Sequence, residues 1–291
     1  NDVPFPRRDL LKEYSWFSCL QATRGCPNKC RYCYLPSTSW SLYRKRDVNL
    51  VYEELKNCKQ KVIFFVDDNL FADRNYAVRL FEKITPLKKI WAVQAPTNIT
   101  KDEELLEKMA LSGCFNLQVG FQTINSKSLQ WAGIENRIQE YGRIVKRLHR
   151  YNILVTAFFI FGFDHDDKSI FKRTAKMIKE IDLDEAHLYI LTPYPGTELY
   201  RQFEKEGRLL NGKDRLSYGW ANAVFKPKLM SPEELEQGVQ ETYHELDGFF
   251  KKKLPWKIIE RLPWLVKQPS LLKVMVRGGL RNVNIRKSIW R

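Results

Sequence analysis

Short apolar runs alternate with amphipathic segments along most of the chain. The amphipathic segments carry apolar residues three and four positions apart, as at Tyr141 and Val145 or Phe171 and Ala175, which predicts helices with one buried face. The runs themselves are rich in β-branched and aromatic residues, which favour strands. They lie at 18–22, 62–66, 90–94, 116–121, 154–161 and 187–191. The pattern therefore predicts six consecutive β/α units.

The strand expected at 62–66, Val-Ile-Phe-Phe-Val, is apolar throughout. Continuous apolar strands are typical of parallel sheets with both faces covered. We therefore expect either a doubly covered sheet or a partial barrel, and six units are too few to close an eight-stranded barrel. The predicted fold class is α/β: a partial (β/α)6 barrel of parallel strands, similar to a TIM barrel, with a helical, basic C-terminal extension.

Four regions are expected along the chain. Ser231 as a helix cap, followed by Pro232 at the first helical position, predicts a helix beyond the barrel. Because the first residue is Asn1 and no signal or transit pattern follows it, we expect that the sequence begins inside a longer parent. The regions are an N-terminal linker, the barrel, an appendage and a basic tail, at 1–17, 18–207, 208–250 and 251–291.

The composition excludes two classes of protein. Hydrophobic residues make up 44% of the 291 residues and aromatic residues 13%, which is ample for a sizeable core, so disorder of the whole chain is excluded. The longest apolar run, at 157–163, is much shorter than the roughly 18 residues needed to cross a bilayer. It therefore predicts a buried strand and not a membrane span.

The positive charge gathers at the C-terminal end. Residues 251–291 hold twelve Lys or Arg and one acidic residue, Glu260, which leaves only +4 of the net +15 for the rest of the chain. Trp256, Trp264 and Trp290 lie among these cations. Such a tail could contact an anionic membrane surface, follow a phosphate backbone, or form an ordinary solvated basic helix.

Three of the six cysteines, Cys26, Cys30 and Cys33, lie within eight residues on the loop after the first predicted strand. In parallel β/α folds, sites assemble at this carboxyl end of the strands. Three thiolates can hold three corners of one cubane, whereas a closed zinc site needs a fourth Cys or His, and none lies nearby. The spacing favours a 4Fe-4S cluster with one open iron. A zinc loop completed by a distant ligand, or three reduced thiols, is the alternative.

The distribution of the cysteines does not resemble a disulfide framework. Metal ligation in a reducing compartment explains it better, so we expect a cytoplasmic protein. The other three cysteines, Cys19, Cys58 and Cys114, are expected to be small buried apolar groups. His187 lies on the sixth predicted strand and points either into the barrel or into the helical layer.

The Cys-x3-Cys-x2-Cys triad, with the aromatic Tyr32 before its third cysteine, resembles the signature of the radical S-adenosylmethionine (SAM) enzymes. The resemblance implies that Cys26, Cys30 and Cys33 bind the cluster and that the amino and carboxylate groups of SAM chelate the open iron. Electron transfer then cleaves SAM to methionine and a 5′-deoxyadenosyl radical, which abstracts hydrogen from the substrate. A reducing donor such as flavodoxin or ferredoxin is the implied partner.

Residues after the second predicted strand are candidates for holding SAM. Asp67, Asp68 and Asn69 stand where the family commonly has a Gly-Gly-Glu-type turn that binds the methionine ammonium. A carboxylate and exposed carbonyls there could accept hydrogen bonds from that ammonium. Helix capping by Asp68 or Asn69 is the alternative for either residue.

Four further residues are cofactor candidates by the same resemblance. Tyr32 could support the adenine, and Gln122, where the family often has glutamate, could bond the ribose hydroxyls. Gly162 resembles the segment that lies along the adenine, and Pro193 closes the sixth strand. Packing or a turn is the alternative for Tyr32, Gly162 and Pro193. No catalytic proton donor or radical quencher is assigned.

Six segments together resemble one branch of this family. Its members typically carry an N-terminal cobalamin-binding domain, and they include hopanoid and other methyltransferases and anaerobic oxidative cyclases that act on porphyrins. No Asp-x-His-x-x-Gly motif is present, so we expect the cobalamin domain, if used, to belong to the parent protein. The segments are 4–11, 67–69, 112–114, 161–164, 193–197 and 225–227.

The resemblance implies hydrogen abstraction from a small, hydrophobic or lipid-like substrate. Methylation with cobalamin, or carbon–carbon bond formation and cyclisation, would follow. Modification of tRNA is the alternative that a net charge of +15 suits, and a non-catalytic zinc or redox-sensing module is a further one. The tail at 251–291 would allow peripheral contact with a membrane, whereas its concentration of charge in one stretch argues against a nucleic-acid partner.

Overall fold

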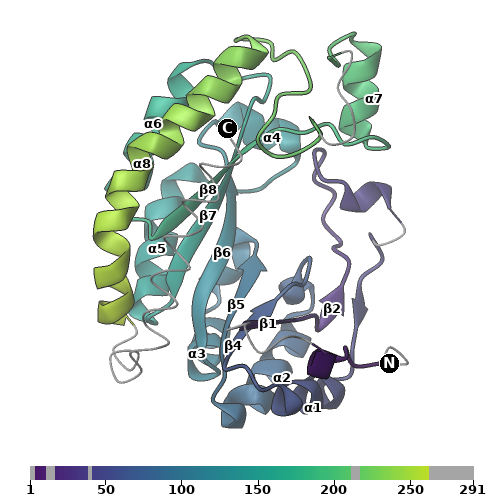
Figure 1. The fold of residues 1–291 in the computed structure, drawn as a ribbon, viewed down its shortest axis with the longest axis vertical. Coiled ribbons are helices and arrows are strands. Elements are labelled where there is room, and N and C mark those ends of the chain that lie inside the picture. Colours follow the sequence, from purple (N-terminus) through teal and green to yellow (C-terminus); the bar gives the residue numbers. More distant parts are fainter. Residues whose placement is uncertain (1–3, 11–16, 39–40, 211–216, 262–291) are drawn as a thin grey trace.

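A computed structural model of the protein describes residues 4–10, 17–38, 41–210 and 217–261. A six-stranded parallel sheet runs through its centre, in the order β1-β4-β5-β6-β7-β8 (Figure 1). Each of the six predicted strands is confirmed, with ends that differ by at most two residues. The strands are β1 Phe17–Leu20, β4 Val62–Phe65, β5 Ile90–Ala95, β6 Cys114–Gln122, β7 Leu154–Phe161 and β8 Glu185–Ile190.

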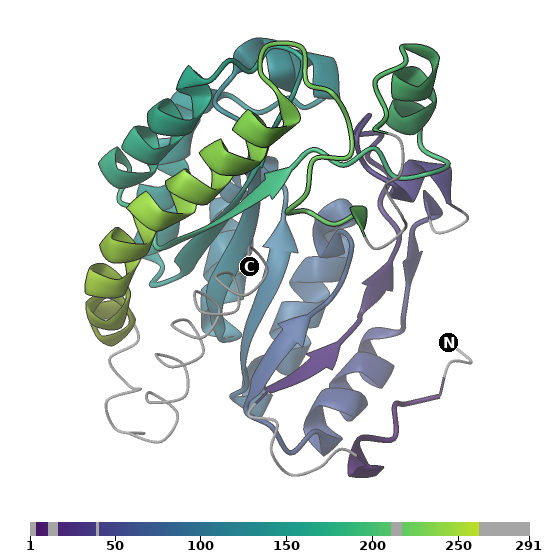
Figure 2. The same ribbon diagram turned by 45° about the horizontal axis from the view of Figure 1, so that its top comes forward.

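Helices cover the convex face of this sheet, and β2 and β3 form a small antiparallel ribbon beside its open, concave side (Figures 1 and 2). The ribbon consists of β2 Thr23–Arg24 and β3 Arg44–Lys45. The helices are α1 Val48–Asn57, α2 Arg74–Ile84, α3 Glu103–Leu111, α4 Ser126–Ala132, α5 Tyr141–Arg150, α6 Ser169–Glu180, α7 Glu198–Lys205 and α8 Pro232–Arg261. The predicted partial barrel is confirmed.

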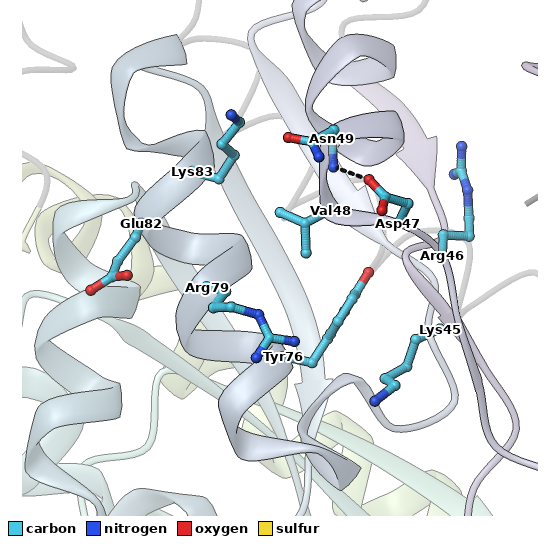
Figure 3. Close-up of a pocket in the computed structure, with 9 residues that line it drawn as sticks. All are labelled: Lys45, Arg46, Asp47, Val48, Asn49, Tyr76, Arg79, Glu82 and Lys83. Atoms are coloured by element: carbon cyan, nitrogen blue, oxygen red, sulfur yellow. Dashed lines mark hydrogen bonds between the residues drawn. The ribbon is translucent and has the colours of Figure 1, made fainter.

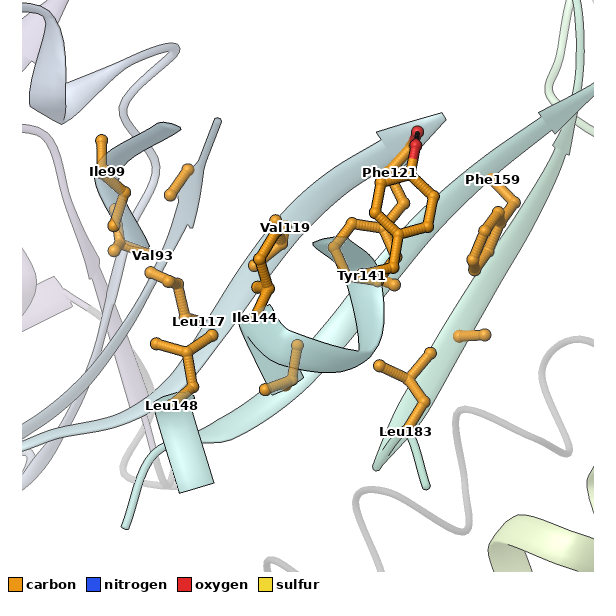
Figure 4. Close-up of a cluster of buried hydrophobic side chains, with 14 of the residues drawn as sticks. Val93, Ile99, Leu117, Val119, Phe121, Tyr141, Ile144, Leu148, Phe159 and Leu183 are labelled. Atoms are coloured by element: carbon orange, nitrogen blue, oxygen red, sulfur yellow. Dashed lines mark hydrogen bonds between the residues drawn. The ribbon is translucent and has the colours of Figure 1, made fainter. Parts of the chain in front are cut away.

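The core lies between the sheet and the helices of its convex face (Figure 4). Along β6 the burial alternates: Leu117, Val119 and Phe121 are buried, and the residues between them are partly exposed. The Phe121 ring stacks on Tyr141 of α5 with centroids 4.0 Å apart, and the Tyr141 hydroxyl donates to the Phe121 carbonyl at 2.6 Å. Burial of each such large side chain stabilises the fold by about 1.5–3 kcal/mol.

Of the expectations about burial, one was wrong. The apolar strand at 62–66 left a doubly covered sheet or a partial barrel open, and the partial barrel is the one observed, because in the described residues helices cover only one face (Figure 2). Phe64 faces the concave side and is shielded there by Phe17 and Phe115, with ring centroids 5.1 and 6.4 Å away. Cys58 and Cys114 are buried as expected, but Cys19 is exposed because it alternates with two buried neighbours on the edge strand β1.

The start of α8 is confirmed. Ser231 Oγ accepts from the Glu234 amide at 3.2 Å, and the Glu234 carboxylate accepts from the Ser231 amide at 2.8 Å, a capping box. The helix continues through residue 250, where the appendage was expected to give way to the basic tail. Residues 262–291 of that tail lie outside the described residues. None of the described helices is both long and apolar enough to span a membrane.

The turn between α3 and β6 depends on a glycine. Gly113 has a φ of 97°, and a Cβ there would lie 2.1 Å from the Lys89 carbonyl oxygen, whereas Gly196, with a φ of 89°, has nothing within 4 Å. We predict that Gly113→Ala lowers the free energy of unfolding by about 3 kcal/mol or more, and Gly196→Ala by about 1 kcal/mol. Urea unfolding measures both, and equal losses would contradict the steric argument.

Candidate metal and cofactor site

The cysteine loop follows β2 and is fastened to the end of α4. The Arg31 amide donates to the Ala132 carbonyl at 3.2 Å, and the Arg31 guanidinium stands 5.1 Å from the Trp131 ring centroid. The Cys33 amide donates to the Cys30 carbonyl at 3.0 Å, which closes a tight turn. These bonds fix a loop that contains no regular secondary structure of its own.

The three loop thiols border one cavity, of about 520 Å³, on the outer side of the loop. Cys26, Cys30 and Cys33 are all half-buried. Burial raises the pKa of Cys33 to about 11, and burial and the neighbouring Cys26 raise the pKa of Cys30. A cationic metal must displace these protons, because thiolates and not thiols ligate metals.

The arrangement of the thiols fits a cluster. In the described part of the chain, no three His, Cys, Asp or Glu side chains converge closely enough to hold a single metal ion. The thiols instead border a common cavity, and a cubane can bridge thiols that are set apart in this way because each of its irons takes its own thiolate. Three thiolates leave one iron of a 4Fe-4S cluster without a cysteine, so that iron is available to another ligand.

A second cavity, of about 170 Å³, lies on the inner, concave side of the loop. It collects side chains from the carboxyl ends of several strands. The structure thus brings four of the predicted cofactor residues together with two of the cysteines: Tyr32, Asp68, Asn69 and Gln122 with Cys26 and Cys30.

Two adjacent carboxylates hold the backbone that leads into the cysteines. Asp67 is buried and accepts from the amides of Ala22 and Thr23 and from the Thr23 hydroxyl, the last at 2.7 Å. Burial raises the pKa of Asp67 to about 6, although these hydrogen bonds act in the opposite direction. Asp68 accepts from the Gly25 amide at 2.8 Å, directly before Cys26. Asp67 therefore lies behind the inner cavity, and Asp68 borders it.

Asn69 contacts a cysteine and also has an unused acceptor. Its Nδ2 donates to Cys26 Sγ at 3.7 Å. Its Oδ1 has no hydrogen-bond partner among the described residues. This atom is buried, and the whole residue is only 5% exposed. Leaving a buried amide oxygen unpaired costs about 1–3 kcal/mol, so this atom is suited to accept a hydrogen bond from a ligand in the inner cavity.

The end of β6 is shaped to present Gln122. This residue has a φ of 68° and follows a bulge in the pairing with β7. A Cβ at Gly120 would lie 2.2 Å from Gln122 Nε2, so a larger residue at position 120 would displace the end of that side chain. Asn136 donates to the Gly120 carbonyl at 2.8 Å and also lines the cavity. Sequence reasoning missed Asn136, which belongs to no motif.

Three predicted cofactor residues line neither cavity beside the cysteine loop: Asp67, which lies behind the inner one, Gly162 and Pro193. Gly162 is buried with a φ of 98°, and a Cβ there would lie 2.8 Å from Leu235 of α8 and 3.2 Å from Phe225. Pro193 is buried in the turn after β8. The next residue after Gly162, Phe163, makes an edge contact with Tyr32 at 6.2 Å between centroids. Gly162 thus directly precedes a residue that packs against Tyr32, and Tyr32 lines the inner cavity.

An aromatic wall continues from the inner cavity along the concave face. Phe158 lines the cavity, and its ring lies 5.3 Å from His187 and 5.9 Å from Tyr189 on the adjacent strand β8. Trp220 meets Tyr189 edge-on at 6.1 Å and is 53% exposed. His187 therefore points into the barrel. We call Phe158, His187, Tyr189 and Trp220 the aromatic wall.

A larger cavity, of about 740 Å³, lies elsewhere, between the start of α1 and α2 (Figure 3). Its lining includes Lys45, Arg46, Arg79 and Lys83 but no cysteine. Lys45 is paired with Asp73, as Arg46 is with Glu54 at 2.6 Å. Size alone therefore does not identify the site, because the metal-binding and cofactor-binding groups are gathered at the cysteine loop.

Curated relatives are methyltransferases and cyclases. Bacteriochlorophyllide d C-12(1)-methyltransferase of Chlorobaculum tepidum is 31% identical over 231 residues, covering 77% of this chain and 50% of that protein. Anaerobic magnesium-protoporphyrin IX monomethyl ester cyclase of Cereibacter sphaeroides is 26% identical over 246 residues, covering 80% of this chain and 39% of the cyclase. The chain spans about half the length of the curated relatives it matches.

Solved structures share the fold at low sequence identity. TsrM of Kitasatospora setae, described as a radical SAM methyltransferase with cobalamin and a [4Fe-4S] cluster bound, has a TM-score of 0.61 at 18% identity, over 76% of this chain and 46% of that one. OxsB, described as a cobalamin-dependent SAM radical enzyme with aqua-cobalamin and SAM bound, has a TM-score of 0.60 at 12% identity, over 88% of this chain and 46% of OxsB.

The part of the chain that matches a known family includes the site. The radical SAM superfamily matches residues 20–178, more than half of the chain. This stretch contains the three cysteines of the loop and the strands from β4 to β7. The chain therefore belongs to the radical SAM superfamily.

Proposed function

We propose that this chain is the catalytic domain of a radical SAM enzyme. Cys26, Cys30 and Cys33 ligate three irons of a 4Fe-4S cluster, and the inner cavity receives SAM at the fourth. One observation carries the proposal: Cys26 and Cys30 line the same cavity as the unpaired Asn69 oxygen and Gln122. When bound, the cluster supplies an electron that cleaves SAM and generates a 5′-deoxyadenosyl radical for hydrogen abstraction.

The residues around the inner cavity bind and orient SAM. Asn69 Oδ1 accepts a hydrogen bond from the methionine ammonium, and Gln122 bonds the ribose hydroxyls. Tyr32 borders the adenine. Asp67 and Asp68 keep the loop in place through the backbone of residues 22–25. Gly162 and Pro193 act from outside the cavity, by setting the turns that follow β7 and β8.

The aromatic wall favours a hydrophobic, flat substrate. It is continuous with the inner cavity through Phe158, so a substrate lying against it would present its edge to the cofactor. None of the described residues that line the inner cavity is Lys or Arg, which argues against a tRNA substrate. The relatives named for bacteriochlorophyllides and for a magnesium protoporphyrin ester support a tetrapyrrole or a similarly flat compound.

The radical outcome is proposed to be methylation or cyclisation. Two relatives are named methyltransferases of bacteriochlorophyllide d, and another is named a cyclase. The structural neighbours TsrM and OxsB are described with bound cobalamin, which supports cobalamin as a further cofactor of this enzyme. Peripheral membrane contact through 251–291 stays a prediction, because 262–291 lie outside the described residues.

Loss of one cysteine of the triad tests the cluster. We predict that anaerobic reconstitution of the wild type gives about four irons per chain, and that Cys30→Ala loses most of that iron. Cys19→Ala serves as the control, because Cys19 is exposed and lines neither cavity beside the loop. Iron analysis and visible absorption measure both variants. Stoichiometric zinc without iron in the wild type would favour the zinc module instead.

The role of Asn69 is tested by SAM binding to the reconstituted protein. We predict that Asn69→Ala weakens SAM binding roughly 10- to 100-fold, because a hydrogen bond to a charged group contributes about 1.5–3 kcal/mol. Asn69→Asp keeps an acceptor and should bind SAM nearly as well, and Asn49→Ala, at an exposed position of α1, should have no effect. Equilibrium dialysis under anaerobic conditions measures the affinities. Wild-type affinity in Asn69→Ala would remove Asn69 from the cofactor site.

The aromatic wall is tested with a flat hydrophobic probe, magnesium protoporphyrin IX monomethyl ester. We predict that Tyr189→Ala weakens its binding about 5-fold or more, since aromatic stacking adds about 0.5–1.5 kcal/mol to the loss of buried area. Tyr52→Ala, on the convex side in α1, is the matched control. Porphyrin absorbance titrations measure both. Equal affinity of Tyr189→Ala and wild type, with tight tRNA binding by both, would favour the tRNA alternative.

A further inference from the structure

The cysteine loop has two accessible sides. Cys26 and Cys30 line both the inner and the outer cavity, whereas Cys33 lines only the outer one of these two. A cluster held by the three thiols would therefore separate the cavities. The inner side leads to the proposed SAM and substrate sites, and the outer side opens at the molecular surface between the loop and α7, which lie side by side in Figures 1 and 2.

The outer side is positively charged. Lys29, Arg31 and Arg201 line the outer cavity, against one carboxylate, that of Glu198. Glu198 meets Arg31 at 3.2 Å, and both side chains are exposed, which leaves the pair strongly hydrated. Lys29 is also exposed, so the lining has a net positive charge at the mouth of the cavity.

Apolar groups accompany these cations. Leu42 lines the outer cavity and is 67% exposed, and Tyr34, directly after Cys33, is 45% exposed. Small interfaces between redox partners bury less than about 1,200 Å² and depend on charge complementarity for their rate of formation. A cationic rim around a few exposed apolar side chains has the composition of such a transient interface.

We propose that the outer face of the cysteine loop is the docking surface for an acidic one-electron carrier protein of the flavodoxin or ferredoxin class. This inference rests on the proposed function. The carrier is oxidised by one electron and the cluster is reduced by one, across the thiols that border the outer cavity. Delivery from this side leaves the inner cavity to SAM, so the carrier and the cofactor do not compete for space.

The other basic cavity, of Figure 3, is a poorer candidate for the same partner. Lys45 and Arg46 there are paired with carboxylates, and no cysteine lines it. Its Arg79 and Lys83 are nevertheless exposed cations on the same molecule. They supply a control in which the same change of net charge is made away from the thiols.

The experiment uses the reconstituted chain and reduced flavodoxin under anaerobic conditions. Lys29→Glu/Arg201→Glu is predicted to lower the second-order rate constant of cluster reduction roughly tenfold or more at low salt. Arg79→Glu/Lys83→Glu should change it less than about twofold. Reduction by dithionite, the iron content and the affinity for SAM should be the same in all three proteins. Flavodoxin binding without electron transfer, measured by interferometry, should weaken in the first variant alone.

Salt gives a test that needs no substitution. The rate of reduction of the wild type by flavodoxin should fall steeply between about 0.05 and 0.5 M salt, because the Debye length shortens over this range. An unchanged rate across this range would overturn the proposed docking surface. Equal slowing by both double variants would overturn it too, as would a first variant that loses tRNA binding but keeps flavodoxin binding. A wild type that holds no 4Fe-4S cluster would overturn the proposed function as well, and iron analysis tells the two failures apart.

Discussion

The site depends on two carboxylates that bind backbone. A loop that surrounds a cluster cannot pair its own amides, so other groups must satisfy and fix them. Asp67 accepts from Ala22 and Thr23, and Asp68 accepts from Gly25. These bonds hold the loop against the end of β4, and the same strand end then delivers Asn69 to Cys26. The position of the thiols is therefore set by the barrel and not by the loop alone.

The open barrel explains how one cluster could serve two sides. Helices cover only the convex face in the described residues, so the concave face stays available for a cofactor and a substrate (Figure 2). The aromatic wall gives that face its character, since Phe158 joins it to the inner cavity. The loop then forms the boundary between this apolar interior and the cationic outer surface at Lys29 and Arg201.

Much of the fold and the metal ligands were predictable, because both depend on local patterns. The strand at 154–161 was predicted to the residue from its apolar run, and the cysteine triad from its spacing. Contacts distant in sequence were not predictable. Asn136 reaches the cavity through bonds to β6, and the environment of Gly162 is set by Leu235, more than seventy residues later. Cys19 was misjudged because its face depends on which side of the sheet the helices cover.

The proposed chemistry requires one iron of the cluster that is free of protein ligands and binds SAM. The most direct test is electron–nuclear double resonance on the reduced, reconstituted protein with SAM labelled with ¹⁵N and ¹⁷O in its methionine group. We expect hyperfine coupling from both the amino nitrogen and a carboxylate oxygen, because direct chelation to iron would produce it. A full 4Fe-4S signal that shows no coupling to either label would contradict it.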